Sequence, residues 1–220
     1  TYGVNPKLAQ EKPKLTARIA ELNKQLAGID AEVKKLGGAN LVALDKEIAS
    51  LRPKAQLKSK RPEFGYHSKI VKSPLTPKWV QVDLGQPIEL RRVVLRPCHD
   101  EFNNIGGGFG FPVRFKIEGA IKADFKEAIL LADQTQTDFP NPDIAPVGFE
   151  VKAKARFLRI TATKLAKRSN DFIFALAELE ALDAAGKNTA RSAKVSSLDS
   201  IEAPVRWRRA NLIDGHFPIA

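Results

Sequence analysis

The sequence is poor in sulfur and has no long apolar run. Cys98 is the one cysteine among 220 residues, which excludes an intrachain disulfide and a cysteine-based zinc or iron–sulfur site. No apolar run approaches the ~18 residues that a membrane-spanning helix needs, so we expect no membrane span. The chain begins at Thr1, contains no methionine and shows no signal-peptide pattern, so we interpret it as a fragment or mature piece of a longer protein.

Motifs of the common catalytic classes are also missing. The three histidines, His67, His99 and His216, form no His-Glu-x-x-His motif, and the chain has no Gly-x-Ser-x-Gly. The glycine-rich stretch 106–110 lacks the Gly-Lys-Ser/Thr of a phosphate-binding loop. No spacing singles out a pair of carboxylates for glycoside cleavage. We therefore predict that the protein is not an enzyme.

Positive charge, in contrast, is in excess and is concentrated near the N-terminus. The net charge is +11, and residues 1–61 carry 13 Lys/Arg against 6 Asp/Glu, a net +7. A basic surface attracts nucleic acid, anionic lipid or acidic polysaccharide. The simpler interpretation is a solvated helical face, and we do not favour nucleic acid as the partner.

Residues 1–61 show the periodicity of helices. Seven apolar residues are separated alternately by four and three positions, which is typical of an amphipathic helix with an a/d heptad seam. They are Leu15, Ile19, Leu22, Leu26, Ile29, Val33 and Leu36. Gly37-Gly38 interrupts the pattern, a second seam runs from Leu41 to Leu51, and we expect Pro53 to end it. The spacing predicts an antiparallel helical hairpin, acting either as a spacer or as a coiled-coil interaction arm.

From Trp79 onward the apolar period changes to two. Val80, Val82 and Leu84 share one face of the first predicted strand, and residues 113–117 and 157–162 alternate in the same way. Turn signals separate these runs, and no strand–helix alternation supports a parallel sheet. The pattern predicts a mainly β domain, a sandwich or a barrel. Residues 175–182 are the exception, because their composition favours a helix.

Two loops combine planar hydrogen-bonding side chains with aromatic rings. Residues 97–112 include His99, Asp100 and two asparagines, and residues 167–172 read Lys-Arg-Ser-Asn-Asp-Phe. Amide, carboxylate, guanidinium and imidazole groups can bind sugar hydroxyls, while an aromatic ring covers the C–H face of a sugar. Polar loops are common on any sandwich, so this signal alone is weak.

Four segments in this order and spacing resemble one known family. They are Trp79–Gly85, Ile88–Leu95, Ala155–Thr161 and Leu176–Glu180. Together, over roughly residues 62–183, they resemble the discoidin family, also called the coagulation-factor C-type or galactose-binding-like domain. The resemblance implies a mainly β fold, a jelly-roll β-sandwich, here with an N-terminal α-helical hairpin. It also implies that residues 175–182 form the last strand and that Trp79 is a core residue.

The opening segment of this family stands in an unusual place. Its Asn-x-x-Asp-Gly motif is missing before Gly65-Tyr-His-Ser68, yet a similar stretch occupies residues 186–220 and ends in Asp214-Gly215. This stretch either folds back to complete one domain over 62–220 or begins a second copy. We favour the first, because an isolated piece could not bury Val195, Leu198 and Leu212. Many family members bind a structural calcium ion, and the resemblance implies Asp214 and Glu178 as its ligands here.

The resemblance also implies where a ligand would bind, since family ligands contact loops at one end of the sandwich. By position, eight residues are the candidates for carbohydrate binding. They are His67, His99, Asp100, Asn103, Asn104, Arg168, Asn170 and Phe172.

The whole sequence further resembles a discoidin-like module of large multidomain haem-c-bearing surface proteins of planctomycete-type bacteria, which implies an extracytoplasmic location. We therefore predict a non-catalytic carbohydrate-binding module of a larger extracytoplasmic protein. The positive charge favours an acidic or sulfated polysaccharide as its partner. The alternative is a structural or docking module that positions neighbouring domains or partner proteins.

Overall fold

The chain forms two compact units, Thr1–Ala55 and Gln56–Ala220, which we treat as separate bodies. The computed structural model describes residues 6–58, 65–191 and 193–219. The predicted boundary between residues 61 and 62 lies outside the described residues. None of the described helices is long and apolar enough to span a membrane.

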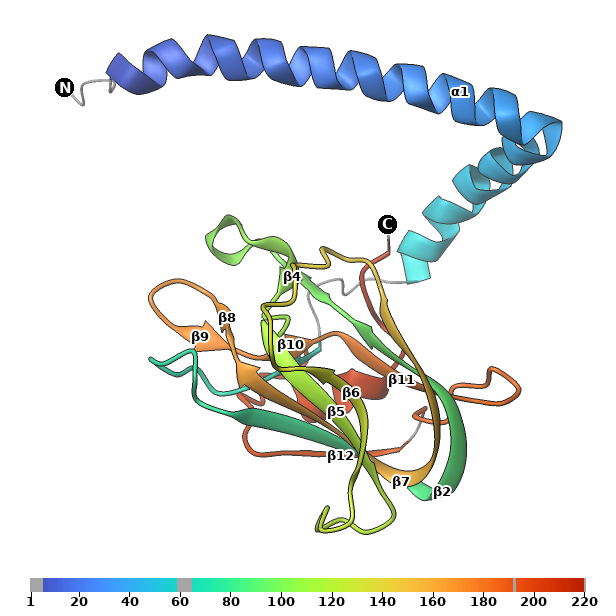
Figure 1. Ribbon diagram of the computed structural model, residues 1–220, viewed down its shortest axis with the longest axis vertical. Coiled ribbons are helices and arrows are strands. Elements are labelled where there is room, and N and C mark those ends of the chain that lie inside the picture. The colour runs from blue at the N-terminus through green and yellow to red at the C-terminus, as the bar shows by residue number, and fades with distance from the viewer. Residues whose placement is uncertain (1–5, 59–64, 192, 220) are drawn as a thin grey trace. The chain divides into compact units, whose positions relative to one another are not determined.

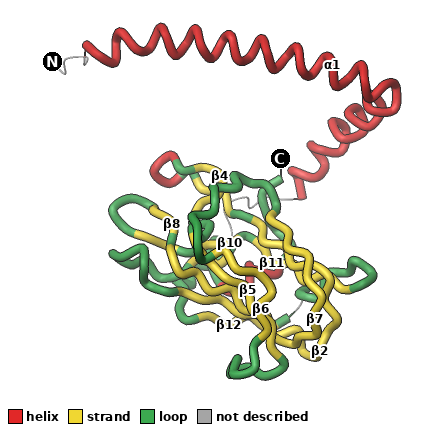
Figure 2. The backbone as a smooth tube through the Cα atoms, in the orientation of Figure 1, coloured by secondary structure: helices red, strands yellow, loops and turns green. Residues whose placement is uncertain are grey.

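The N-terminal unit is helical, but it is not the packed hairpin that the sequence predicts. Helix α1 spans Pro6–Lys58, so Pro53 does not end it, and Gly38 alone departs from helical geometry with φ 62° and ψ −160°. This single residue produces the one sharp bend of α1 in Figure 2. The apolar residues of the first seam are 45–83% exposed, so the two stripes do not bury each other. The reason is local: one non-helical residue makes a kink, whereas an antiparallel hairpin needs a loop of about 2–5 residues.

The second unit is built on one large antiparallel sheet. Its strands run in the order β11-β2-β7-β5-β6, and β12 also pairs with β2. Their bounds are Lys78–Arg96 (β2), Arg114–Ala120 (β5), Ile129–Gln134 (β6), Val147–Lys164 (β7), Glu178–Asp183 (β11) and Lys194–Ser197 (β12). The long strands β2 and β7 run side by side and curve together in Figure 1. Their register breaks between Asp83 and Ile88, where Gly85 has φ 84°.

Short elements form the opposite layer. Three two-stranded sheets pair β1 with β10, β3 with β4 and β8 with β9. Their bounds are Tyr66–His67 (β1), Cys98–Asp100 (β3), Gly106–Phe109 (β4), Ala166–Lys167 (β8), Phe172–Ile173 (β9) and Ala175–Leu176 (β10). Two 3-10 helices complete the unit, η1 at Phe102–Asn104 and η2 at Arg209–Ile213.

The core lies between these layers and explains why the strands form where they do. Inward residues of the large sheet alternate with polar residues, as a half-buried strand requires. The inward set, with no exposed surface, includes Val80, Val82, Phe115, Ile117, Leu158 and Ile160. The fully buried Tyr66, Phe174 and Leu176 of the opposite layer belong to the same core cluster. The prediction of a mainly β sandwich with a helical N-terminal segment is thereby confirmed.

Two expectations drawn from the family resemblance had different outcomes. Residues 175–182 are extended, in β10 and β11, although their composition favours a helix. Trp79, in contrast, is not a core residue. It is only partly buried, on the face of β2 opposite to Val80, and the Arg159 guanidinium lies 4.7 Å from its ring centroid. The period of two decides this outcome, because neighbours in a strand point to opposite faces.

The C-terminal segment packs into the same body as the rest of the sandwich. Strand β12 pairs antiparallel with β2, and Val195 lies opposite Val82. Leu212 is fully buried in the core cluster, Val195 packs against it, and Leu198 stays 53% exposed. The segment therefore covers β2 and closes one side of the core.

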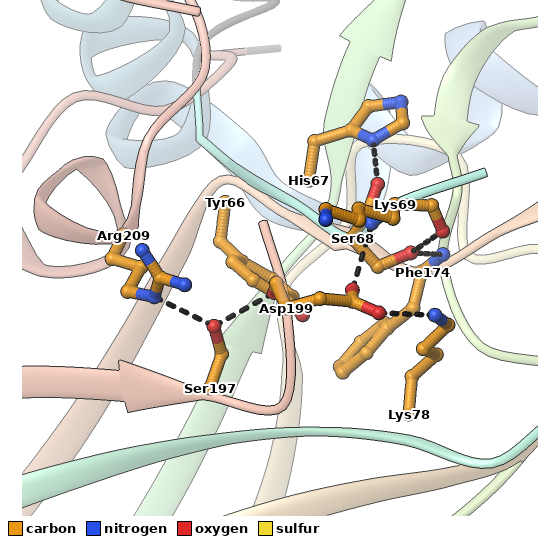
Figure 3. A network of polar contacts seen from close by, with 9 residues as sticks. All are labelled: Tyr66, His67, Ser68, Lys69, Lys78, Phe174, Ser197, Asp199 and Arg209. Atoms are coloured by element: carbon orange, nitrogen blue, oxygen red, sulfur yellow. Dashed lines mark hydrogen bonds and ion pairs between the residues drawn. The ribbon is translucent and has the colours of Figure 1, made fainter. Parts of the chain in front are cut away.

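A polar network around Asp199 fastens this segment (Figure 3). The Asp199 carboxylate pairs with the Lys78 ammonium, whose side chain is only 5% exposed, and accepts the Lys69 backbone N–H at 2.8 Å. The Asp199 carbonyl oxygen accepts hydrogen bonds from the Tyr66 hydroxyl at 3.1 Å and the Ser197 hydroxyl at 2.7 Å. Burial raises the pKa of Tyr66, so this hydroxyl keeps its proton and remains a donor.

Candidate functional site

The two polar loops singled out in the sequence meet in the structure. The Asn103 side-chain amide, between β3 and β4, donates a hydrogen bond of 3.1 Å to the Arg168 carbonyl oxygen, between β8 and β9. The Arg168 guanidinium also lies 4.6 Å from the ring centroid of Phe102. Figure 1 shows both loops at one end of the β-rich unit, away from the turn that joins β5 to β6. We call Phe102–Asn104 together with Arg168–Phe172 the loop ridge.

The tip of the first loop folds as its residue types allow. Asn103 and Asn104 have φ values of 54° and 56°, a left-handed conformation that asparagine tolerates better than most residues. The Asp100 carboxylate accepts the Phe102 backbone N–H at 2.9 Å and pairs with Arg206 at 2.6 Å. Asp100 is 7% exposed. It therefore holds the tip in place and does not face a ligand, contrary to the sequence prediction.

The second loop is fixed by an internal ion pair. Two nitrogens of the Arg168 guanidinium donate to the Asp171 carboxylate, at 3.0 and 2.7 Å. These hydrogen bonds raise the pKa of Arg168 and lower the pKa of Asp171, so both stay charged. Arg168 is thereby a positioning group for the Phe102 ring and not an unpaired cation.

The two candidate histidines have different surroundings. His67 is 3% exposed, its Nδ1 lies 2.6 Å from the Ser68 carbonyl oxygen, and its ring contacts those of Phe109 and Trp207. Burial lowers the pKa of His67, which keeps it neutral near pH 7. His67 is thus a core side chain, and its prediction as a surface ligand-binding residue is wrong. The His99 side chain is 34% exposed, and its Nε2 lies 3.1 Å from Glu101.

The exposed part of the loop ridge still offers varied chemistry. Asn103, Asn104 and Asn170 are exposed, and Phe172 is partly buried against the core. Phe102, which is 45% exposed, is absent from the predicted site residues, although it lies in the quoted loop. Its place in a polar loop with neighbouring asparagines was the one available signal, because its immediate neighbours alone do not distinguish it from a buried strand residue. The loop ridge therefore combines exposed amide groups with an exposed ring.

A shallow hollow lies beside the ridge. It encloses about 150 Å³ and is lined in part by Gly108, Phe139, Asn141 and Lys167. The Asn141 amide donates to the Gly107 carbonyl at 3.1 Å. A Cβ at Gly108 would lie 1.7 Å from the Asn141 Oδ1, so the glycine allows this close approach.

The predicted calcium ligands lie near each other. Glu178 is 1% exposed, and its carboxylate accepts the Gly215 N–H at 3.0 Å, while the Asp214 carboxylate accepts the His216 N–H at 2.9 Å. Burial, and to a smaller degree the Asp214 charge, raises the pKa of Glu178 to about 8. The charge of Arg191 acts in the opposite direction and lowers the pKa of Glu178. Within the described residues no group of three or more His, Cys, Asp or Glu could hold a metal, so backbone carbonyls would supply the other ligands.

Comparisons with known proteins return structures but no sequence relatives. No protein-family model and no curated protein matches the chain. The chain is similar to the family 32 CBM (carbohydrate-binding module) from C. perfringens NanJ in complex with galactose, with 19% identity and a TM-score of 0.40 over 52% of this chain and 73% of that chain.

Two further solved structures show the same level of similarity. CBM32-3 from a family 31 glycoside hydrolase of Clostridium perfringens has 19% identity and a TM-score of 0.41, over 54% of this chain and 74% of that chain. Chitosan-binding module 1 from a chitosanase/glucanase of Paenibacillus sp. IK-5 has 16% identity and a TM-score of 0.38, over 51% and 73% of the two chains.

Proposed function

We propose that the protein is a non-catalytic carbohydrate-binding module whose loop ridge contacts a polysaccharide. One observation carries the proposal: the Asn103–Arg168 hydrogen bond brings two polar loops together around the exposed Phe102 ring. A sugar ring presents hydroxyls at its rim and C–H groups on its face. The exposed amides of Asn104 and Asn170 match the rim, and the Phe102 ring matches the face.

The charges of the ridge favour a neutral sugar. Arg168 is balanced by Asp171, Arg206 by Asp100, and His99 lies beside Glu101. With these pairs formed, little net charge remains to attract an anion. The loop ridge would therefore bind sugar hydroxyls through hydrogen bonds. Its affinity for the sugar would be modest and would not fall steeply with salt concentration.

An acidic or sulfated polysaccharide, which the net charge favours, has a different place to bind. A hollow of about 330 Å³ at the Gly85 turn is lined by Arg156, Arg191 and Lys194 together with Asp83. Asp83 balances only Arg156, through two hydrogen bonds of 2.8 and 2.9 Å. Among the described residues Arg191 and Lys194 form no ion pair, so a sulfated glycan would be held here, and salt would weaken its binding.

Calorimetric titration of neutral and sulfated polysaccharides tests the proposal. We expect neutral glycan binding to weaken at least about tenfold in Asn104→Ala and Phe102→Ala, since each loses a direct contact. Asn40→Ala is the matched control, because this exposed asparagine belongs to the helical unit. No binding to any glycan by the folded protein, or equal loss in the control, would refute the proposal.

Two further parts and one alternative accompany this proposal. Asp214 and Glu178 would hold a structural calcium ion, which would neutralise their repulsion. The module would belong to a larger extracytoplasmic protein. The alternative role, a structural or docking module, is favoured by a different observation, the exposed apolar seam of α1.

A further inference from the structure

The apolar seam of α1 has no partner within the described residues. Its six central residues are each 45–61% exposed, which is far more than such side chains show in a folded core. They are Leu15, Ile19, Leu22, Leu26, Ile29 and Val33. The second stripe does not cover them, since Leu44 and Ile48 are themselves 56% and 51% exposed. The spacing of four and three is that of a coiled coil and not of a broad globular face.

The heptad positions of the seam define its flanking residues. Ile19, Leu26 and Val33 occupy a positions, so Arg18, Gln25 and Glu32 occupy the g positions beside them. Arg18 and Glu32 are exposed, and among the described residues neither takes part in an ion pair. The g positions therefore carry one free positive and one free negative charge, placed on opposite sides of Gln25.

The charges of two copies of this helix are complementary when the copies lie antiparallel. In an antiparallel pair, g positions face g positions, so centring the pair on Gln25 brings Arg18 of each copy to Glu32 of the other. The same register pairs six of the seven apolar residues of the seam with one another, and Leu36 lies opposite Lys12. The layers, each formed twice by the two-fold axis, are Leu15 with Val33, Ile19 with Ile29, and Leu22 with Leu26.

Other arrangements of the two helices do not bring Arg18 and Glu32 together. In a parallel pair each g position faces the e position of the next heptad, so Arg18 would face Asn23 and Glu32 would face Gly37. An antiparallel pair shifted by one heptad, toward Leu36, would place Arg18 opposite Ala39 and Glu32 opposite Gln25. The apolar layers of the register centred on Gln25 also end at Val33, before the bend at Gly38.

We propose that α1 is a homodimerisation element, in which residues 15–33 of two copies of this chain form an antiparallel coiled coil whose g positions are centred on Gln25. The occupant of the seam is thus a second copy, chosen by charge complementarity. The contact is about 27 Å long and buries an area at the lower end of the range for stable interfaces. Dimerisation should therefore be concentration-dependent.

Sedimentation equilibrium of the full chain is the first test. We expect a monomer–dimer equilibrium, weakened about tenfold by Arg18→Glu, which places like charges together at both ends of the contact. The double variant Arg18→Glu/Glu32→Arg restores both pairs and should dimerise like the unmodified chain. Lys24→Glu is the matched control, since it makes the same charge change at the outward f position. The proposal is overturned if the chain stays monomeric at roughly millimolar concentration. The seam would then be buried within the chain or would bind another protein.

Thiol cross-linking tests the direction of the helices. In the proposed register the two Leu15 positions are about 27 Å apart, whereas Leu15 lies opposite Val33 of the other copy. Leu15→Cys and Val33→Cys should each fail to cross-link alone with a short bismaleimide and should cross-link when mixed. Native Cys98 is fully buried, so the unmodified chain is the blank. Cross-linking of either variant alone indicates a parallel pair and refutes the proposed register.

Discussion

The Asp199 network gives the sharpest test of how the C-terminal segment is held. Asp199→Ala removes the carboxylate that pairs with the Lys78 ammonium and accepts the Lys69 N–H (Figure 3). The Lys78 side chain is 5% exposed, so its charge would remain in the protein without a partner and with little water. Removal of one member of a buried ion pair typically costs about 3–5 kcal/mol.

Such a loss is large for a domain of this size. The free energy of unfolding of a typical domain is about 5–15 kcal/mol, so Asp199→Ala should remove a third or more of it. The melting temperature should fall by roughly 10 °C. Urea denaturation followed by tryptophan fluorescence measures the effect without interference from α1, because both tryptophans, Trp79 and Trp207, lie in the β-rich unit.

The double variant Lys78→Met/Asp199→Ala separates the charge effect from the loss of hydrogen bonds. Removing both charges leaves no unpaired ammonium, so the double variant should be more stable than Asp199→Ala alone. A loss of less than about 1 kcal/mol in Asp199→Ala would refute the reasoning. So would a double variant that is less stable than either single variant.

Three other predictions concern Glu178 and the glycine-rich strand. The pKa of Glu178 is raised to about 8 from an ordinary 4.5, so the protonated carboxyl stabilises the fold. This stabilisation is complete below about pH 4.5 and is lost as the pH rises to 8. In urea denaturation, Glu178→Gln should flatten this dependence of the unfolding free energy on pH. If calcium binds Glu178 and Asp214, millimolar calcium should raise the melting temperature more at pH 8 than at pH 5. Asp214→Asn should abolish this increase. Equal melting curves with calcium and with a chelator would count against the site. Gly108→Ala should lower the free energy of unfolding by about 1–2 kcal/mol more than Gly186→Ala does. Both glycines have positive φ (74° and 76°), but only a Cβ at Gly108 would clash with Asn141. Thermal melts that give equal losses of stability would contradict this packing.

Alternation in the sequence was enough to predict the main strands. Val80 and Val82, or Phe115 and Ile117, repeat every second residue because one face of each strand is buried. The same rule, applied strictly, also places Trp79 on the outer face, against the expectation from the family resemblance. Residues 175–182 show the opposite case, since their helix-favouring composition yields to pairing of Leu179 with Leu95 and of Ala181 with Val93.

The helical unit and the site show what periodicity leaves open. A heptad seam indicates that a helix needs a partner, but it does not indicate whether the partner is the next helix or another chain. In the loops, residue type singled out 97–112 and 167–172, the family resemblance implied one end of the sandwich for both, and the Asn103–Arg168 hydrogen bond joins them there. It could not predict that His67 and Asp100 are buried, because burial there depends on Trp207 and Arg206, which are over 100 residues away in the chain.

The C-terminal position of β12 has a consequence for synthesis of the protein. On the ribosome, β2 emerges more than a hundred residues before β12, which pairs with its first half. Until then Lys78 lacks Asp199, and the core lacks Leu212. The nascent sandwich therefore closes only after β12 and Leu212 have been synthesised, and a product released early at residue 190 would expose its interior to chaperones and proteases.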